Sequence, residues 1–548
     1  MVEQIVVAPL VIALGAAVAS LLTRRWGGLQ RAVSLAGGVA YLGAVALLFQ
    51  RVATDGTLTY QVGKWTAPYG ISLVADPLAM FMLALAAVVS LAALAFSVLY
   101  VDDDEQRLSY HALYHMMVLG VTGSFLTGDL FNLFVWFEVM LMASYVLVVF
   151  YGRAEHTRAA LQYVVLNLVG SALMLVAIGG LYGVTGTLNM AQMSERLATT
   201  PAGVAALPAL GLTAVLFAVF ALKAGLVPFQ WWVPATYSAA PAPVSAMLAA
   251  VVKKVGVYAI IRLYFTVFSG LEIPGGLALP GLSGTGLLGF YGPVLFLMAA
   301  ASIVLGGVAA VAHDDLDQVL AYSSIGQVGF IVLPLAVAAT VPAGTIATVP
   351  GLAEPISLRA LGLTAALVYA LNHAVAKGGL FLATGAVDSM TGTTDLRRLG
   401  GLTGAVPTLS AGVFVGGLGL IGIPPLSGFF AKFLVFDTAA RAATASGPLG
   451  LGGPELALAT ALLGATLTIA YVTRLWNRGF WGATGDAVER LSPATGQVAV
   501  ALVLIAGVLV IGLAFDPVFD AAVDAAQAAL DSEGYIDAVD PQAEVSGE

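Results

Sequence analysis

Apolar runs of about 20 residues recur along the whole chain, and an α-helix of that length crosses the hydrocarbon core of a bilayer. The composition supports the same interpretation, because 59% of the 548 residues are hydrophobic and only 10% are charged. A soluble protein of this length would carry far more charge. The first run, 5–22, is longer than the apolar part of a secretory signal, so we expect it to be retained. The sequence therefore predicts an all-α polytopic membrane protein in contact with the lipid bilayer.

The apolar runs divide into about fourteen predicted spans. They are 5–23, 33–50, 77–101, 111–127, 129–150, 159–184, 206–240, 242–265, 290–312, 318–340, 359–388, 405–438, 456–476 and 496–515. The seventh span is broken at 225–228 and the twelfth at 422–425, and interrupted helices at matching positions are typical of a transport pathway. Because the two breaks are five spans apart, an odd number, the units around them are predicted to be inverted relative to each other.

Loop arginines predict the orientation. Basic residues concentrate in the loops after spans 1, 3, 5, 11 and 13, while the opposite loops hold few. By the positive-inside rule the basic loops are cytoplasmic, which places both termini outside the cell membrane. The tail, 516–548, carries nine acidic residues and no basic one, and we expect it to begin as an amphipathic stretch and then to fray.

Lysine and arginine are divided between two environments. Of the six lysines, all but Lys64 lie within apolar segments, whereas the arginines lie mostly in loops or at segment ends. An ammonium at the bilayer centre costs roughly 2.5–3.5 kcal/mol on insertion scales. A desolvated lysine can release its proton, whereas an arginine stays charged. This division indicates that the buried lysines face the protein interior and carry protons.

Glu138 lies about a third of the way into the fifth span, and Lys223 lies within the seventh. The functional interpretation is a pair that trades a proton or tightens and loosens as charge passes; the alternative is a static buried ion pair. Lys254 in the eighth span has the same two interpretations. Lys253 and Lys254 differ by about 100° around a helix, so we expect only one to face the interior, with the other snorkelling or lying against a neighbouring helix.

His373 and Lys377 are four residues apart in the eleventh span and share one face of its helix. A histidine titrates near neutrality, which suits a relay between lysines, although a lone histidine in a membrane span can also be a hydrogen-bonded packing residue. Lys432 follows the break in the twelfth span. We expect it to act in the same path, the alternative being a snorkelling side chain.

Several classes of function find no support in the sequence. The chain has no cysteine, which excludes disulfides, thiolate catalysis and Cys-ligated metals or clusters. No metal-ligand spacing, nucleotide-binding loop or hydrolytic triad stands out, and the glycine-rich stretches suit helix packing. We therefore expect no cofactor, no metal site and no nucleic-acid partner.

At the lysine-bearing stretches the chain resembles a known family. The stretches are GDLFNLFVWFEVMLMASYVLV, FALKAGLVPFQWWVPATYSAAPAPVSAML, KKVGVYAIIR, DQVLAYSSIGQVGF, NHAVAKGGLFLATGAV and GLIGIPPLSGFFAKF. They resemble the proton-translocating, antiporter-like subunits shared by respiratory complex I, membrane-bound hydrogenases and Mrp (multiple resistance and pH) cation/proton antiporters, chiefly the D-type member of the Mrp antiporters. The resemblance covers roughly residues 5–515.

The resemblance implies fourteen helices with two inverted five-helix repeats, spans 4–8 and 9–13, in which helices 7 and 12 are broken. The implied organisation is 1–103 for helices 1–3, 104–265 and 290–478 for the repeats, 490–515 for the last helix and 516–548 for the acidic tail. The implied proton-transfer residues are Glu138, Lys223, Lys254, His373, Lys377 and Lys432. Some relatives place a histidine where this chain has Gln327, which cannot relay a proton by titrating.

The sequence thus favours a non-enzymatic, secondary active transporter subunit. It would conduct protons within a hetero-oligomeric antiporter for a monovalent cation, together with other membrane subunits, and the resemblance implies sodium as the cation. The alternative is a proton-pumping subunit of a complex I-like NADH/quinone oxidoreductase or a membrane-bound hydrogenase. A solute permease fits less well, because buried charges spread over five spans do not converge on one substrate site.

Overall fold

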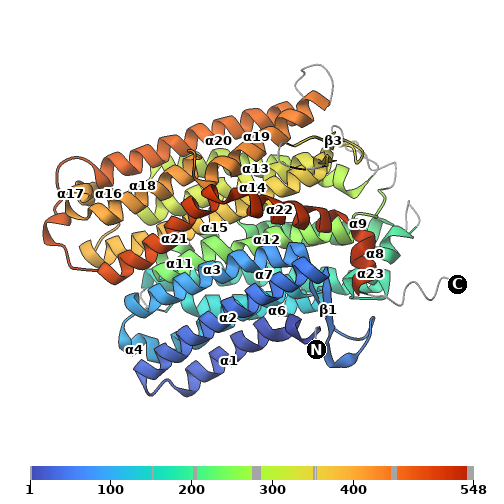
Figure 1. The fold of residues 1–548 in the computed structure, drawn as a ribbon, viewed down its shortest axis with the longest axis horizontal. Coiled ribbons are helices and arrows are strands. Elements are labelled where there is room, and N and C mark those ends of the chain that lie inside the picture. Colours follow the sequence, from blue (N-terminus) through green and yellow to red (C-terminus); the bar gives the residue numbers. More distant parts are fainter. Residues whose placement is uncertain are drawn as a thin grey trace.

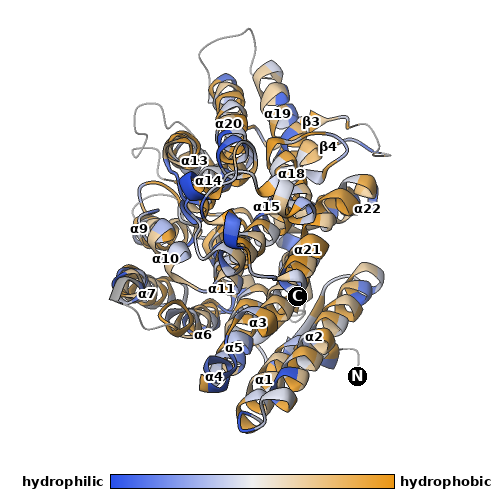
Figure 2. Ribbon diagram, turned by 90° about the vertical axis from the view of Figure 1, so that its left-hand side faces the viewer, coloured by the Kyte–Doolittle hydropathy of each residue, from blue (hydrophilic) through white to orange (hydrophobic). Residues whose placement is uncertain are grey.

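The computed structural model describes residues 3–150, 154–200, 206–273, 286–349, 352, 354–445 and 453–539. Most of these residues are helical, and the long helices run side by side along the longest axis of the molecule (Figure 1). Viewed from the end of the bundle, hydrophobic residues dominate nearly every long helix (Figure 2). The predicted all-α membrane fold is confirmed.

The helices follow one another with short connections. The long helices are α1 (Ala8–Leu22), α2 (Gly27–Asp55), α3 (Pro77–Tyr100), α5 (His111–Leu126), α6 (Leu130–Val148), α7 (Ala154–Thr185), α9 (Leu207–Ala224), α13 (Leu287–Ala312), α14 (Leu316–Thr340), α15 (Leu358–Thr391), α18 (Pro407–Ile421), α19 (Ser427–Ala445), α20 (Gly453–Leu475), α21 (Thr495–Leu513) and α22 (Phe515–Leu530). The predicted eighth span is continuous from α11 (Ala242–Met247) to α12 (Lys253–Ile260), with a π-helical turn between them and another after α12.

Short elements fill the ends of the bundle. The helices are α4 (Asp103–Glu105), α8 (Met190–Ala198), α10 (Trp232–Ala239), α16 (Leu396–Leu399), α17 (Leu402–Ala405) and α23 (Ser532–Val539). Strand β1 (Leu58–Gln61) pairs antiparallel with β2 (Ser72–Ala75), and β3 (Ile346–Ala347) pairs with β4 (Ile356–Ser357). Most of these elements connect the long helices at the ends of the bundle.

Within the described residues, twelve helices are long and apolar enough to cross a membrane. The other two predicted spans are helical but are not among the twelve: α5 has 16 residues, and the twelfth span is divided into α18, with 15 residues, and α19, which has 19 residues but carries three charged ones. Each predicted span therefore coincides with helix, while the count of fourteen crossings and the proposed domain limits stay predictions.

An internal repeat is visible in two matching corners. Segments 185–189 (TGTLN) and 391–395 (TGTTD) follow α7 and α15, and each contains a glycine with left-handed φ, 68° at Gly186 and 69° at Gly392. Each corner pairs its backbone with the start of an earlier helix, through Leu130 N–Leu188 O (2.8 Å) in one case and Leu316 N–Thr394 O (3.0 Å) in the other. The adjoining helices α8 and α16 lie at opposite ends of the bundle (Figure 1). This arrangement is that of two inverted repeats.

Both predicted breaks are present. Helix α9 ends at Gly225 with φ 70°, and α10 resumes at Trp232; α18 ends at Gly422 with φ 94°, and α19 resumes at Ser427. A residue with a Cβ atom is disfavoured at such φ values, so glycine permits each helix to stop within the bundle.

The bundle is centred on the helices that carry the lysines. The most apolar window of the Ala242–Val267 span is 100% buried, against 94% for α14 and 89% for α15, while the windows of α20 and α21 are 28% and 33% buried. The Ala242–Val267 span, α14 and α15 are therefore surrounded by protein, whereas most of the surface of α20 and α21 is free to contact lipid or other subunits.

The expectation that the tail frays is wrong as far as residue 539. Helix α22 packs on α3 and α15, Thr266 Oγ1 donates to Ala529 O (2.7 Å), and Tyr535 of α23 is 4% exposed. The apolar face of α22 finds a surface formed by helices distant in sequence, which compensates for its ordering. Residues 540–548 of the predicted tail lie outside the described residues.

Candidate functional site

Lys223 lies in the last turn of α9, directly before the break, and is 1% exposed. Its Nζ lies 3.3 Å from Tyr163 Oη and 5.4, 5.5 and 5.8 Å from the ring centroids of Phe137, Tyr163 and Trp232. Three aromatic faces attract an ammonium without neutralising it. The site can therefore hold the lysine in a fixed position while leaving its proton available for transfer.

Glu138 on α6 is half-buried and accepts a hydrogen bond from Ser171 of α7. No ion pair within 4.0 Å joins it to Lys223, although the preceding residue, Phe137, contacts that lysine. The structure thus places the two predicted partners in one neighbourhood but not in direct contact, so a proton passing between them needs a side-chain movement or an intermediate.

Lys254, His373 and Lys377 form a central group where the two repeats meet. Lys254 Nζ lies 2.5 Å from His373 Nδ1 and donates to Ala249 O (2.9 Å). Lys377 donates to Leu320 O (3.0 Å) and to the hydroxyl of Ser323 on α14. All three side chains are 0% exposed. The predicted proximity of these residues is present, and their roles in proton transfer stay predictions.

Of the two outcomes expected for the second lysine of the Lys253–Lys254 pair, snorkelling is wrong and contact with a neighbouring helix is confirmed. Both are 0% exposed, because protein surrounds this span on every side, and the two amines extend to different neighbours. Lys253 Nζ reaches Ser324 O (3.4 Å) on α14, whereas Lys254 reaches His373 on α15.

Lys432 lies on α19, beyond the second break, and is 4% exposed, so it does not snorkel to a surface. Its Nζ donates to Ile421 O (3.0 Å), the last carbonyl of α18, and lies 5.2 Å from the centroid of Phe330. A cation at a helix C-terminus is favoured by the helix dipole. The break in the twelfth span thus frees a helix-end carbonyl, Ile421 O, that accepts the hydrogen bond from Lys432.

Gln327 connects α14 to two helices through tyrosines that the sequence analysis missed. Tyr369 Oη donates to Gln327 Oε1 (2.6 Å), and Gln327 Nε2 donates to Tyr471 Oη (3.1 Å) and Thr468 Oγ1 (3.3 Å). The sequence contained one signal for this network, since each of these polar residues lies within an otherwise apolar span. The network lies in the second repeat, on the helix that also receives Lys253 and Lys377.

None of the five buried lysines has a carboxylate within 4.0 Å among the described residues; the ion pairs found there all involve arginine. In a low-dielectric interior, like charges a few ångströms apart repel strongly. A proton added to Lys254 therefore raises the energy of protonating His373, whose Nδ1 lies 2.5 Å away, which couples the occupancies of these two sites.

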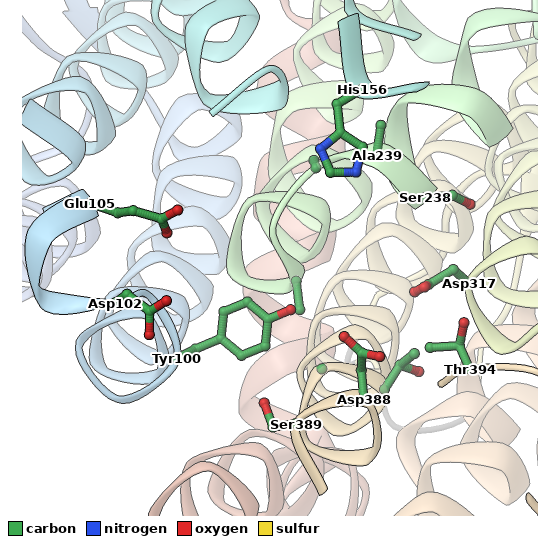
Figure 3. A pocket seen from close by; sticks show the side chains of 14 residues that line it. Tyr100, Asp102, Glu105, His156, Ser238, Ala239, Asp317, Asp388, Ser389 and Thr394 are labelled. Atoms are coloured by element: carbon green, nitrogen blue, oxygen red, sulfur yellow. The ribbon is translucent and has the colours of Figure 1, made fainter. Parts of the chain in front are cut away.

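An acidic cavity of about 420 Å³ opens at the end of the bundle that carries α4 and α16. The carboxyl groups of Asp102 and Glu105 lie on one side of it and those of Asp317 and Asp388 on the other (Figure 3). Ser238 and Ala239, at the end of α10, also line it. No group of three or more His, Asp or Glu side chains in the described part of the chain is placed to hold a metal ion.

The sequence analysis also missed a buried ion pair just after the C-terminal end of α12. Arg262 Nη2 lies 2.6 and 2.5 Å from Oδ1 and Oδ2 of Asp76, and both residues are 2% exposed. The guanidinium lies 4.8 Å from the ring centroid of Tyr535 in α23. In the sequence, Asp76 before a proline indicates only a helix cap, which it also is, since it accepts from Ala79 N (2.8 Å).

Comparison with known proteins places this geometry in a family. The family model described as "NADH:quinone oxidoreductase/Mrp antiporter, TM" matches residues 127–349 and 355–447. The chain is 33% identical over 514 residues to the D subunit of the Na(+)/H(+) antiporter of Alkalihalophilus pseudofirmus, covering 93% of this chain and 94% of that one. It is 37% identical over 437 residues to the N subunit of the NADH-quinone oxidoreductase of Desulforudis audaxviator, covering 78% of each.

Among solved structures, a chain of the Mrp complex from Dietzia sp. DQ12-45-1b superimposes with a TM-score of 0.81 and 27% identity, covering 98% of this chain and 99% of that one. The fold is thus that of an antiporter-like membrane protein. The chain belongs to the NADH:quinone oxidoreductase/Mrp antiporter family of membrane subunits, and within it to the D-type members of Mrp antiporters.

Proposed function

We propose that the chain is the proton-conducting subunit of a monovalent cation/proton antiporter, with sodium as the cation, and that it works together with other membrane subunits in the plasma membrane. The observation that carries the proposal is the row of buried lysines, with His373, that have no carboxylate counter-ion in the described chain. The name of the Alkalihalophilus relative and the Mrp complex from Dietzia support the cation and the partners.

In this proposal protons enter near Glu138 and Lys223, cross the middle of the bundle through Lys254, His373 and Lys377, and leave near Lys432. Each of these residues is a group that can accept and release a proton, and neighbouring amine and imidazole groups repel one another when both are protonated. The inward flow of protons drives export of the cation. Both termini lie outside, since the arginine-rich loops adjoin α4 and α16 at the opposite end of the bundle.

The test is cation/proton exchange in vesicles that carry the whole complex, with sodium, potassium and lithium compared. Replacing Glu138 by Gln or Lys223 by Met preserves much of each side-chain volume and removes the ability to exchange a proton at physiological pH. We expect either change to reduce exchange about 100-fold or more, a typical contribution of a proton-transfer group. Wild-type exchange in an assembled variant would refute the proposal.

The likeness to the N subunit of an NADH-quinone oxidoreductase supports one alternative, a subunit of a redox-driven proton pump. The same lysines would then carry protons, and electron transfer in partner subunits would supply the energy. Purification of the tagged chain with its partners distinguishes the two functions. Iron–sulfur or flavin absorbance in the complex would favour the redox pump, whereas cofactor-free membrane partners would favour the antiporter.

A further inference from the structure

Lys253 is the buried lysine that the path described above does not use. It is 0% exposed, and its Nζ lies 3.4 Å from Ser324 O on α14 and 5.7 Å from the ring centroid of Tyr237 on α10. It also lies against the first break, since a Cβ atom placed on Gly225 would come within 3.5 Å of Nζ. The amine therefore sits where the broken helix of the first repeat meets a helix of the second.

Each contact of Lys253 leads to another lysine. The ring of Tyr237 meets that of Trp232 edge to face at 6.2 Å, and Trp232 is one of the three rings around Lys223. Ser324 follows Ser323, whose hydroxyl accepts from Lys377. Lys254 is the next residue of the chain. Lys253 thus adjoins both the Lys223 site and the central group.

The two residues that contact the Lys253 amine, and the residue before one of them, carry unpartnered polar atoms. Tyr237 Oη, Thr236 Oγ1 and Ser324 Oγ are buried and have no hydrogen-bond partner among the described protein atoms. Buried polar groups in folded proteins are normally satisfied, and a small ligand that both donates and accepts, such as water, satisfies such a cluster. Ser238, the residue after Tyr237, lines the acidic cavity of Figure 3. Helix α10 therefore contributes both to the lining of the cavity, through Ser238, and to the surroundings of the Lys253 amine, through Tyr237.

A purely structural role accounts poorly for this lysine. Its amine lies near the C-terminal end of α9, where the helix dipole favours a cation. That favourable interaction is smaller than the cost of holding an ammonium at bilayer depth without a counter-ion. A proton carrier needs the charge only part of the time, so the cost applies only while the proton is held.

We propose that Lys253 is a further proton-carrying residue, which exchanges protons with Lys223 and the central group on one side and with the acidic cavity on the other. The proposal rests on the proposed function, proton conduction by this chain. In each step the Lys253 nitrogen lone pair binds one proton, and the same nitrogen then releases it to a neutral acceptor, so no other reactant is needed.

The experiment measures exchange in vesicles that carry the whole complex, with assembly quantified by co-purification. Lys253→Met and Lys253→Gln remove the titratable group, Lys253→Arg keeps a permanent charge, and Lys253→His keeps a titratable one. Lys64→Gln, at the exposed lysine outside the apolar segments, is the matched control. We expect the Met, Gln and Arg variants to lose about tenfold or more of the exchange rate, and the His variant to exceed the Gln variant clearly.

Full exchange by Lys253→Gln would overturn the proposal, and so would rescue by Lys253→Arg, which would show that a fixed cation suffices. If Arg or Met prevents assembly, the comparison of His with Gln decides alone, because equal rates for these two variants would also overturn it. Failure of the proposed function is recognised separately. In that case the Glu138 and Lys223 variants would also retain exchange, whereas a wrong assignment of Lys253 alone leaves those two inactive.

Discussion

The Asp76–Arg262 pair offers a prediction whose magnitude can be worked from the structure. Both residues are 2% exposed, and the carboxylate accepts from one guanidinium nitrogen at 2.5 and 2.6 Å. Removing one partner of a buried pair leaves an uncompensated charge and costs about 3–5 kcal/mol. Asp76 also caps α3 through Ala79 N, and loss of a cap adds about 1 kcal/mol.

Three variants separate these contributions. Asp76→Asn keeps a capping oxygen and loses the charge, so we expect it to lower the free energy of unfolding by about 3–5 kcal/mol. Asp76→Ala loses both functions and should cost about 1 kcal/mol more. The double variant Asp76→Asn/Arg262→Met removes both charges and should recover most of the loss, because replacing a whole buried pair is often neutral.

The assay is unfolding of the purified complex in mixed micelles of rising SDS content, followed by tryptophan fluorescence, with the double-mutant cycle giving the coupling energy. A cost below about 1 kcal/mol for Asp76→Asn would refute the reasoning, since it would mean that Arg262 is not desolvated as its burial implies. A double variant that is less stable than either single variant would refute it as well.

Three further predictions concern the repeats. Gly422→Ala places a Cβ atom on a residue with left-handed φ, and that atom would lie 3.1 Å from the backbone oxygen of Gly428. We expect the free energy of unfolding in the same assay to fall by roughly 1–2 kcal/mol. Gly404→Ala, whose Cβ would meet nothing within 4 Å, is the control and should cause no loss. Gln327→Leu removes the acceptor of the Tyr369 hydroxyl and should cost about 1–3 kcal/mol. Gln327→Glu can still accept from Tyr369 and should cost less, so equal costs for the two variants would contradict this network. The hydrogen bonds from Arg397 hold the pKa of Asp395 at about 2, below its ordinary 3.8, so its contribution to the α15–α16 corner is present above pH 3.8 and is lost as the pH falls toward 2. The Arg397 amide should therefore be equally protected from deuterium exchange at about pH 8 and about pH 5, after correction for intrinsic exchange rates. Loss of that protection at about pH 5 would contradict the lowered pKa of Asp395.

The sequence predicts well those features that local chemistry determines. Run length and hydropathy locate the helices, glycine followed by proline locates the breaks at Gly225 and Gly422, and a spacing of four residues places His373 and Lys377 on one face. Each of these rules concerns residues close together in the chain. The family resemblance adds which repeat units belong together, and the matching corners after α7 and α15 agree with it.

The features that failed depend on contacts between distant segments. Helical periodicity separates Lys253 from Lys254 by direction, but it does not tell whether protein also covers the second direction. The charge of the tail indicates disorder, whereas the surface on α3 and α15 that orders α22 is invisible in the tail itself. The sequence pairs Glu138 with Lys223 but does not tell how far apart they lie; the structure gives Glu138 a hydroxyl donor from α7, and proton exchange between the two residues stays a prediction.

Helix α15 runs without interruption for 34 residues, from Leu358 to Thr391. It therefore behaves as a stiff rod, and any displacement along its axis moves His373 and Lys377 by the same amount. Lys223 and Lys432 sit instead beside backbone discontinuities, where a short segment can shift alone. In the proposed pathway His373 and Lys377 thus move as one piece while the two flanks can adjust separately, which makes the flanks the places where we expect a gate.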